Sequence, residues 1–156
     1  MDNARSSPIL IVGNWCRPLA QSASRAGIEA IVLDLFADAD TRRYARAAHC
    51  IANVEQRHID IELAACLAQR FGGNCKALVY AAGFERQPEA LLRIAAGRRI
   101  FGNSAASVRA VKEPAALCNL LRQVGLPHPE TLMHRPKAAS GWLVKRAGEQ
   151  GGAHVL

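Results

Sequence analysis

Three mostly apolar runs constrain the fold of this chain more than any other feature of its sequence. They are residues 8–13, 28–34 and 76–83, and the first and third end in glycine. Strands that are apolar at nearly every position are typical of a parallel sheet covered on both faces. Residues 17–26, between the first two runs, have Pro18 near their start and Gly27 after their end, which indicates a helix. The sequence therefore predicts a βαβ unit with a right-handed crossover.

The same alternation continues to about residue 113. Residues 36–46 are polar and predict a connection with a short helix at most, whereas 50–54 predict a weak strand at an edge of the sheet. Further expected elements are a helix over 60–71, a helix over 87–96, a strand over 99–102, and a helix that has Ser104 as its N-cap and reaches Val111. We therefore predict an α/β fold with a Rossmann-like, doubly wound, mainly parallel sheet and the three apolar runs at its centre.

The pattern of alternating strands and helices ends after Glu113. Residues 114–124 have the apolar spacing of an amphipathic helix, 125–131 form a turn with two prolines, and the loop that follows lacks periodicity. We predict a Rossmann-like domain over residues 1–113, and a linker helix with the start of a second domain over 114–156.

A glycine-rich loop lies near the end of the chain. Residues 142–144 have strand character, Lys145 follows, and the loop contains Gly148, Gly151 and Gly152. The backbone N–H groups of such a loop can bind a phosphate, and Lys145 would add a positive charge. A solvated hairpin with a surface lysine is the alternative.

The charge is uneven along the chain. Residues 1–83 contain nine Lys or Arg and eight Asp or Glu, whereas residues 84–156 contain eleven and five. This basic half favours a polyanionic ligand, and with only eight aromatic residues in the chain a nucleotide is a better candidate than nucleic acid.

Composition also limits the location and the redox chemistry. The sequence has no uncharged run of 18 residues and no signal-peptide pattern, so we expect a cytoplasmic protein without a membrane span. Its five cysteines are widely spaced and contain no C-x-x-C, which favours reduced thiols, mostly small core residues. The histidines have no ligand spacing, and we expect no metal held by this chain alone.

In their order along the chain, the helix 114–124, the Gly-Leu-Pro-His-Pro-Glu-Thr turn 125–131 and the strand and loop 142–155 resemble the front end of an ATP-grasp enzyme. The similarity is strongest to amino-acid ligases of the type that make pyrrolysine precursors. It implies an ATP-dependent carboxylate–amine ligation through an acyl phosphate, with magnesium. The metal ligands and the adenine site of such enzymes lie beyond Leu156. The chain would then be an N-terminal fragment, inactive by itself and not expected to bind ATP or Mg²⁺ tightly, with its catalytic residues unknown.

One position departs from the family pattern. ATP-grasp enzymes usually have a lysine or arginine eleven residues before the turn glycine, but Pro114 stands there in this sequence. Lys112 lies two residues away and is a candidate substitute in phosphate binding. A helix-terminal lysine without a special role is the alternative.

A second site is expected where the first and third apolar runs end, because an open α/β sheet forms its crevice there. Its candidate residues are Asn14, Trp15, Arg17, Phe84, Glu85 and Arg86. Such groups can orient a small acceptor, an amino acid or another carboxylate. Packing and capping of the following helices is an equally good interpretation.

Two other functions were weighed. Asp34 lies 21 residues after Gly13, where an NAD-binding protein has its ribose carboxylate, but Trp15 and Pro18 stand where the phosphate turn needs glycines. Asp34 is otherwise a loop-capping or solvent-facing acid. A non-enzymatic α/β module that holds a partner with its basic half is the other alternative. The apolar C-terminal strands should be either disordered or paired with another copy of the chain, and we favour self-association through them.

Overall fold

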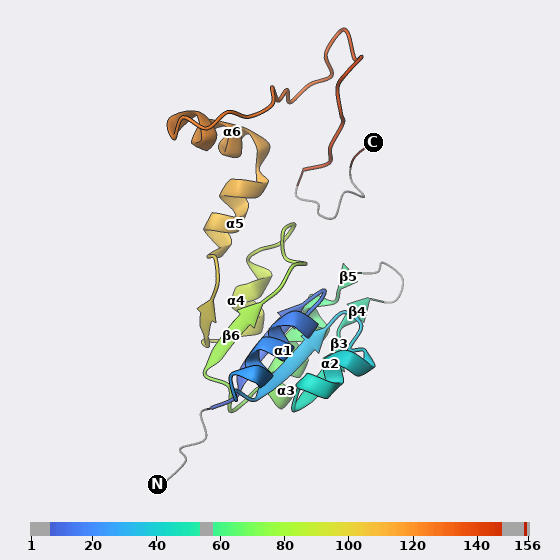
Figure 1. Cartoon of the computed structure of the whole chain (residues 1–156), viewed down its shortest axis with the longest axis vertical. Helices are drawn as coiled ribbons and strands as arrows, with labels where there is room; N and C mark the ends of the chain where they lie inside the picture. Colours follow the sequence, from blue (N-terminus) through green and yellow to red (C-terminus); the bar gives the residue numbers. More distant parts are fainter. Residues whose placement is uncertain (1–6, 54–57, 148–154, 156) are drawn as a thin grey trace. The chain divides into compact units, whose positions relative to one another are not determined.

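The computed structural model describes residues 7–53, 58–147 and 155 of the chain, which form two compact units. The first unit contains residues 7–84 and 89–102, and the second contains residues 85–88 and 103 onward. Figure 1 shows the elements of both. The boundary predicted at Glu113 stays a prediction, and helix α5 before it groups with α6.

The first unit is built on a parallel sheet in the order β3-β2-β1-β6-β7. Its strands are β1 (Ile9–Gly13), β2 (Ala30–Asp34), β3 (Ala47–Cys50), β6 (Ala77–Tyr80) and β7 (Arg99–Phe101). Every neighbouring pair is parallel, and β1 lies in register with β2 from Ile9↔Ala30 to Gly13↔Asp34. This confirms the predicted α/β sheet with the three apolar runs at its centre.

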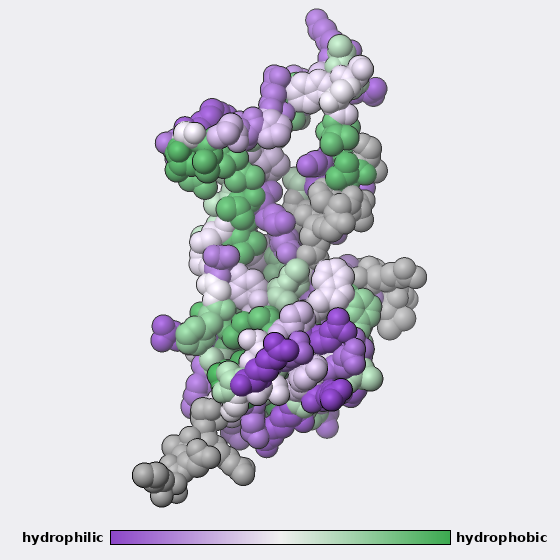
Figure 2. Space-filling view, in the orientation of Figure 1, coloured by the Kyte–Doolittle hydropathy of each residue, from purple (hydrophilic) through white to green (hydrophobic). Residues whose placement is uncertain are grey.

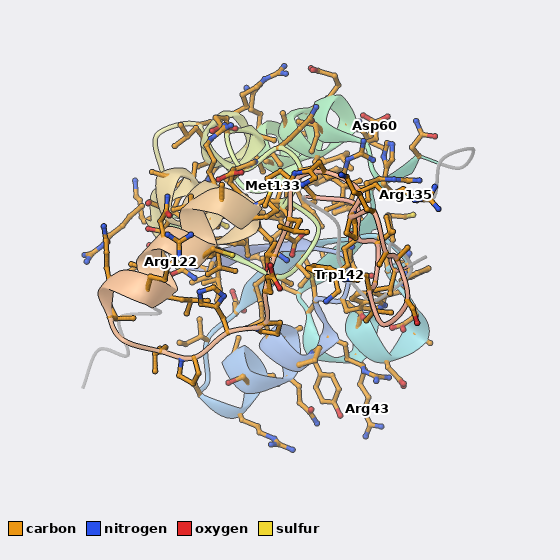
Figure 3. The ribbon with its side chains drawn as sticks, turned by 90° about the horizontal axis from the view of Figure 1, so that it is seen from above. Arg43, Asp60, Arg122, Met133, Arg135 and Trp142 are labelled. Carbon is orange, nitrogen blue, oxygen red and sulfur yellow. The ribbon has the colours of Figure 1, made fainter. Side chains whose placement is uncertain are left out.

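Helices cover both faces of the sheet, as the uniformly apolar strands require. They are α1 (Arg17–Arg25), α2 (Ala39–Tyr44), α3 (Ile61–Phe71) and α4 (Ala90–Ala95). Figure 3 shows α1 and α2 on one side and the green α3 and α4 on the other. A hydrophobic core lies on each face of the sheet, and alternate residues of β1 point into each. Leu10 and Val12 pack with α3 and α4, whereas Ile11 packs with α1.

Short side chains begin the helices. The carboxylates of Asp38 and Asp60 accept hydrogen bonds from the backbone N–H groups of Thr41 and Leu63, at 2.7 and 3.0 Å. Both are N-caps, which satisfy donors that a helix leaves unpaired.

A separate antiparallel pair joins β4 (Ala52–Asn53) to β5 (His58–Ile59). The strand predicted at 50–54 is thus wrong in its bounds, because edge strand β3 spans Ala47–Cys50 and residues 52–53 pair with β5 instead.

The second unit consists of α5 (Ala105–Lys112), α6 (Pro114–Gln123) and the following extended segment. Ser104 begins α5 as predicted, since its hydroxyl accepts a hydrogen bond from Ser107 N–H at 3.1 Å. The Glu113 carboxylate accepts from Ala115 and Ala116 N–H and so begins α6. Figure 2 shows apolar side chains gathered over α6, where Leu120 and Val124 are exposed.

Candidate functional site

The ends of β1 and β2 are fixed by one buried carboxylate. Asp34, the last residue of β2, is 2% exposed and accepts hydrogen bonds from the backbone N–H groups of Cys16, Phe36 and Ala37 at 2.6, 2.8 and 2.8 Å. The loop-capping interpretation of Asp34 is therefore confirmed. A carboxylate used in this way does not point at an NAD ribose, and the sheet end next to it presents Trp15, which is 58% exposed.

Burial raises the pKa of the Cys16 thiol strongly, and the neighbouring Asp34 charge adds to this effect. The thiol also lies 3.5 Å from the Leu33 carbonyl oxygen, to which it donates. Cys16 is thus a neutral core residue rather than a nucleophile. All five cysteines are free thiols, and three of them, Cys16, Cys75 and Cys118, are buried, as the sequence predicted.

Besides Trp15, three candidate crevice residues belong to the first unit, and their environments differ. Asn14 is 8% exposed, and its side-chain Oδ1 is buried without a hydrogen-bond partner among the described residues. Arg17 forms an exposed ion pair with Asp40 at 3.0 Å. Phe84 is a core residue, with its ring edge-on to Tyr80. Of these three side chains only Arg17 is exposed, and it is ion-paired, whereas Asn14 and Phe84 are buried.

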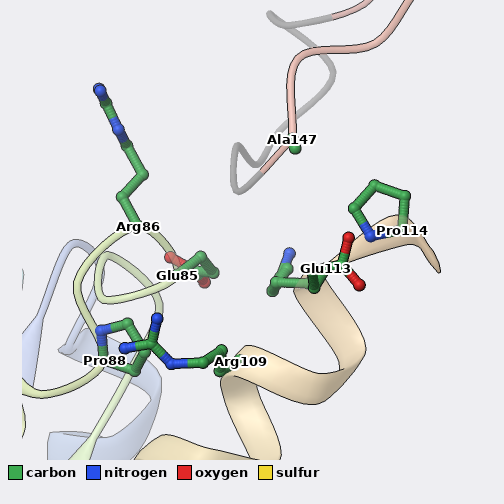
Figure 4. A pocket seen from close by; sticks show the side chains of 8 residues that line it. Glu85, Arg86, Pro88, Arg109, Glu113, Pro114 and Ala147 are labelled. Carbon is green, nitrogen blue, oxygen red and sulfur yellow. The ribbon is translucent and has the colours of Figure 1, made fainter. Parts of the chain in front are cut away.

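Glu85 and Arg86 belong to the second unit, where they line a pocket of about 300 Å³ (Figure 4). The other lining residues are Pro88, Arg109, Lys112, Glu113, Pro114 and Ala147. Two predictions therefore meet in one place. Lys112, the candidate phosphate lysine, lines the same pocket as Ala147, which immediately precedes the glycine-rich loop.

The pocket contains three cationic side chains and two carboxylates. The cations are Arg86, Arg109 and Lys112, and the acids are Glu85 and Glu113. The Glu113 carboxylate accepts hydrogen bonds from α6 at both of its oxygens. This composition suits an anionic ligand, because guanidinium and ammonium groups donate charge-assisted hydrogen bonds to phosphate or carboxylate oxygens.

Sequence reasoning missed Arg109 and Pro88. A signal for Arg109 was present, since it precedes Lys112 by three positions in a predicted helix, and residues so spaced share a helix face. Pro88 lines the pocket because residues 85–88 lie close to α5, which is distant in sequence. A local sequence pattern cannot predict such a contact.

The glycine-rich hairpin is only partly within the described residues. Lys145 and Val155 form an isolated antiparallel bridge, as a hairpin requires, and Lys145 is exposed. Residues 142–144 form no strand, so that expectation is wrong. An isolated two-stranded ribbon is marginal, because its strands lack further partners. Gly148, Gly151 and Gly152 lie outside the described residues.

No helix among the described residues is long and apolar enough to cross a membrane. Within the same residues, no three His, Cys, Asp or Glu side chains come together as metal ligands would.

Comparison with known proteins gives matches among solved structures. No family model matches the sequence, and no curated protein matches it. The biotin carboxylase domain of Hydrogenobacter thermophilus 2-oxoglutarate carboxylase, in complex with MgADP, ADP and bicarbonate, has a TM-score of 0.70 and 15% identity over 96% of this chain and 37% of that one.

Two further enzymes are similar. N5-carboxyaminoimidazole synthetase from Staphylococcus aureus, complexed with ADP, has a TM-score of 0.56 and 20% identity over 77% of this chain and 30% of its own. Pyruvate carboxylase from Rhizobium etli has a TM-score of 0.57 and 18% identity over 81% of this chain and 13% of its own. This chain thus spans 13 to 37% of these proteins. At these identities the likeness concerns the fold alone, and this chain shares the fold of the matched part of these carboxylases and of the synthetase.

Proposed function

We propose that this chain is the N-terminal part of an ATP-dependent carboxylate–amine ligase, to which it contributes the acceptor-side domain and the glycine-rich phosphate loop. The observation that carries the proposal is the pocket in which Lys112 and Ala147, the residue before the loop, come together. ATP is the expected co-substrate, with Mg²⁺.

The reaction needs the cations that this pocket contains. A carboxylate oxygen attacks the terminal phosphorus of ATP, the bond to the bridging oxygen breaks, and ADP leaves. An amine then attacks the acyl carbon and expels phosphate. In the first step two anions must approach each other, so positive side chains such as Lys112 in the pocket, and Lys145 before the glycine-rich loop, are needed to offset their repulsion and to align them.

Nucleotide binding is the first test. In the complete protein we expect magnesium-dependent ATP binding by isothermal titration calorimetry, and an affinity about tenfold lower after Lys145→Ala, because one charge-assisted hydrogen bond is lost. Lys137→Ala, at an exposed lysine that does not line the pocket, is the control. If ATP does not bind, or binds equally to the Lys145 variant, the ligase proposal fails in favour of a non-enzymatic partner-binding module.

The acceptor is expected to be a small molecule with a carboxylate. Arg17 and Glu85 are the charged acceptor candidates that the sequence offers, and each is tested by itself, since a zwitterion such as an amino acid needs a partner of either sign. Once a substrate screen has identified the acceptor, Arg17→Gln and Glu85→Gln should raise its KM severalfold while ATP affinity stays within twofold. Equal effects on acceptor and ATP would remove these residues from the acceptor site.

Self-association is proposed for the C-terminal segment. Leu143 and Val144 are exposed, and apolar side chains in an extended segment favour pairing with another copy. Light scattering of the chain should show concentration-dependent dimers that the double variant Leu143→Ser, Val144→Ser loses. A monomer at all concentrations, or dimers that survive in the variant, would contradict this.

A further inference from the structure

A histidine on the edge strand of the first unit has a buried ring nitrogen without a partner. His49 lies on β3, at one end of the five-stranded sheet. The residue is partly buried, and its Nε2 atom is shielded from solvent without a hydrogen-bond partner among the described residues. Buried polar atoms in proteins nearly always have a partner, which can be a water molecule or an ion. The partner of this nitrogen is therefore to be sought outside the described residues.

Two arginines flank the His49 ring. Arg70 and Phe71 end helix α3, and the His49 ring stacks on the Phe71 ring with centroids 4.0 Å apart. The Arg70 guanidinium carbon lies 5.1 Å from the centroid of the same Phe71 ring. Arg42 comes from α2, on the opposite face of the sheet (Figure 3), and its Nε donates to the Ala37 carbonyl oxygen at 2.8 Å. Each face of the sheet thus contributes one cation near this edge.

Both arginines are exposed and have hydrogen-bond donors to spare. Within the described residues, the terminal nitrogens of Arg42 form no hydrogen bond, and the Arg70 guanidinium forms neither a hydrogen bond nor an ion pair. Burial, followed by the charges of Arg42 and Arg70, lowers the pKa of His49. On β2, its neighbour Leu33 has no charge, and the next residue, Asp34, holds three backbone N–H groups. The described carboxylates therefore do not offset this positive cluster.

We propose that Arg42, Arg70 and His49 form a binding site for a phosphate group. Each guanidinium can donate two parallel hydrogen bonds to such a group, and the Nε2–H of the imidazole can donate another. A phosphate has three oxygens free for bonding and about two negative charges, which suits donors from three elements better than the two oxygens of a carboxylate. All three residues belong to the first unit, and the proposal does not rest on the ligase function.

The test follows the His49 ring signal of the whole chain by NMR during titration with inorganic phosphate, at constant ionic strength. Loss of the signal in His49→Phe identifies it. We expect saturable binding, and the bound anion should make His49 hold its proton about tenfold more tightly, because it favours the imidazolium form. Glycerol 3-phosphate is the probe for a phosphate monoester, and acetate is the probe for a carboxylate.

Variants of the two arginines test the site itself. Arg70→Gln should lower the phosphate affinity about tenfold, because a charge-assisted contact is lost. Arg42→Gln should act in the same direction, and if it fails to fold, Arg42→Lys tests this position with an expected loss of about threefold. Arg43→Gln is the matched control, since Arg43 is exposed on the same helix and its charge is not among those that act on His49. Its affinity should stay within twofold of the wild type.

The outcomes decide both the site and its ligand. Tighter binding of inorganic phosphate or of glycerol 3-phosphate supports the proposal and identifies the free ion or the monoester as the source. A His49 signal that does not respond to either probe would overturn it, as would equal losses in Arg43→Gln and Arg70→Gln, which indicate unspecific attraction of anions. Acetate binding as tightly as phosphate would also overturn it, because the ligand would then be a carboxylate.

Discussion

The carboxylate of Asp34 accepts a hydrogen bond of 2.6 Å from the backbone N–H of Cys16, and this contact joins the end of β2 to the loop after β1. Because Asp34 also holds Phe36 and Ala37 N–H, one side chain fixes both loops at this end of the sheet. The local geometry around Asn14 and Trp15 therefore depends on a residue that contacts no ligand in our proposal.

Replacing this carboxylate should destabilise the first unit. Asp34→Ala leaves three backbone N–H groups near the core without their acceptor, and we expect a loss of about 3 kcal/mol in the free energy of unfolding. Urea denaturation followed by circular dichroism measures it. Glu29→Gln, which removes an exposed ion pair with Arg46, is the control and should cost less than about 1 kcal/mol. Equal effects of the two substitutions would contradict the capping role.

Gly83 is required where β6 ends, for steric and backbone reasons together. Its φ is +121°, and a Cβ atom there would lie 2.5 Å from Asn14 Oδ1 and 2.6 Å from Ile59 Cδ1. Gly97 has a φ of +84° but no atom within 4 Å of such a Cβ, so Gly97→Ala reports backbone strain alone. We expect Gly97→Ala to lower the free energy of unfolding by about 1 kcal/mol, and Gly83→Ala to lower it by about 2 kcal/mol more. Urea denaturation measures both. Similar costs would show that the space around Gly83 relaxes freely.

Arg98 joins the C-terminal ends of two helices. Its guanidinium donates to the carbonyl oxygens of Ala68 and Gly72 at the end of α3, both at 2.9 Å, and of Ala95 at the end of α4, also at 2.9 Å. Cations at helix C-termini stabilise the unpaired carbonyl groups there. Arg98→Gln should therefore lower the free energy of unfolding by about 2 kcal/mol.

The neighbouring arginine supplies the comparison for this prediction. Arg99 is exposed, and its guanidinium lies over the Phe101 ring at 4.7 Å. Such an exposed contact contributes about 0.5–1 kcal/mol. Thermal unfolding of Arg98→Gln and Arg99→Gln should thus give clearly different midpoints, and a larger effect at Arg99 would contradict the helix-joining role of Arg98.

His49 should make stability depend on pH. Its ring stacks on Phe71 with centroids 4.0 Å apart, and burial, followed by the charges of Arg42 and Arg70, lowers its pKa. The unfolded chain then binds a proton at a higher pH than the folded one, so stability should fall as the pH drops below about 6.5 toward the folded pKa. His49→Phe should remove this part of the loss.

The measurement is the melting temperature of wild type and His49→Phe between pH 7.5 and 5. We expect the difference between the two proteins to change in favour of the variant as the pH falls, because only the wild type must protonate a stacked ring. A difference that is constant over this range would show that His49 does not titrate differently on folding.

The sequence by itself determined the elements whose signals are local. The continuous apolar runs established β1, β2 and β6 as inner parallel strands, because strands covered on both faces have no polar face. Ser104 identified the start of α5, since an N-cap side chain bonds within its own first turn. The order of helix, turn and glycine-rich loop indicated the fold that the structural comparisons then supported.

The tertiary structure alone decided features that depend on contacts distant in sequence. The sequence suggested that residues 84–86 form one loop. In the structure, Phe84 lies in the core, whereas Glu85 and Arg86 line the pocket with Arg109. The strand predicted at 142–144 did not form, because pairing energy comes from neighbouring strands that a local pattern cannot supply. Strand character is thus readable from sequence, whereas the partners that a strand, a loop or an arginine meets are set by how the chain folds back on itself.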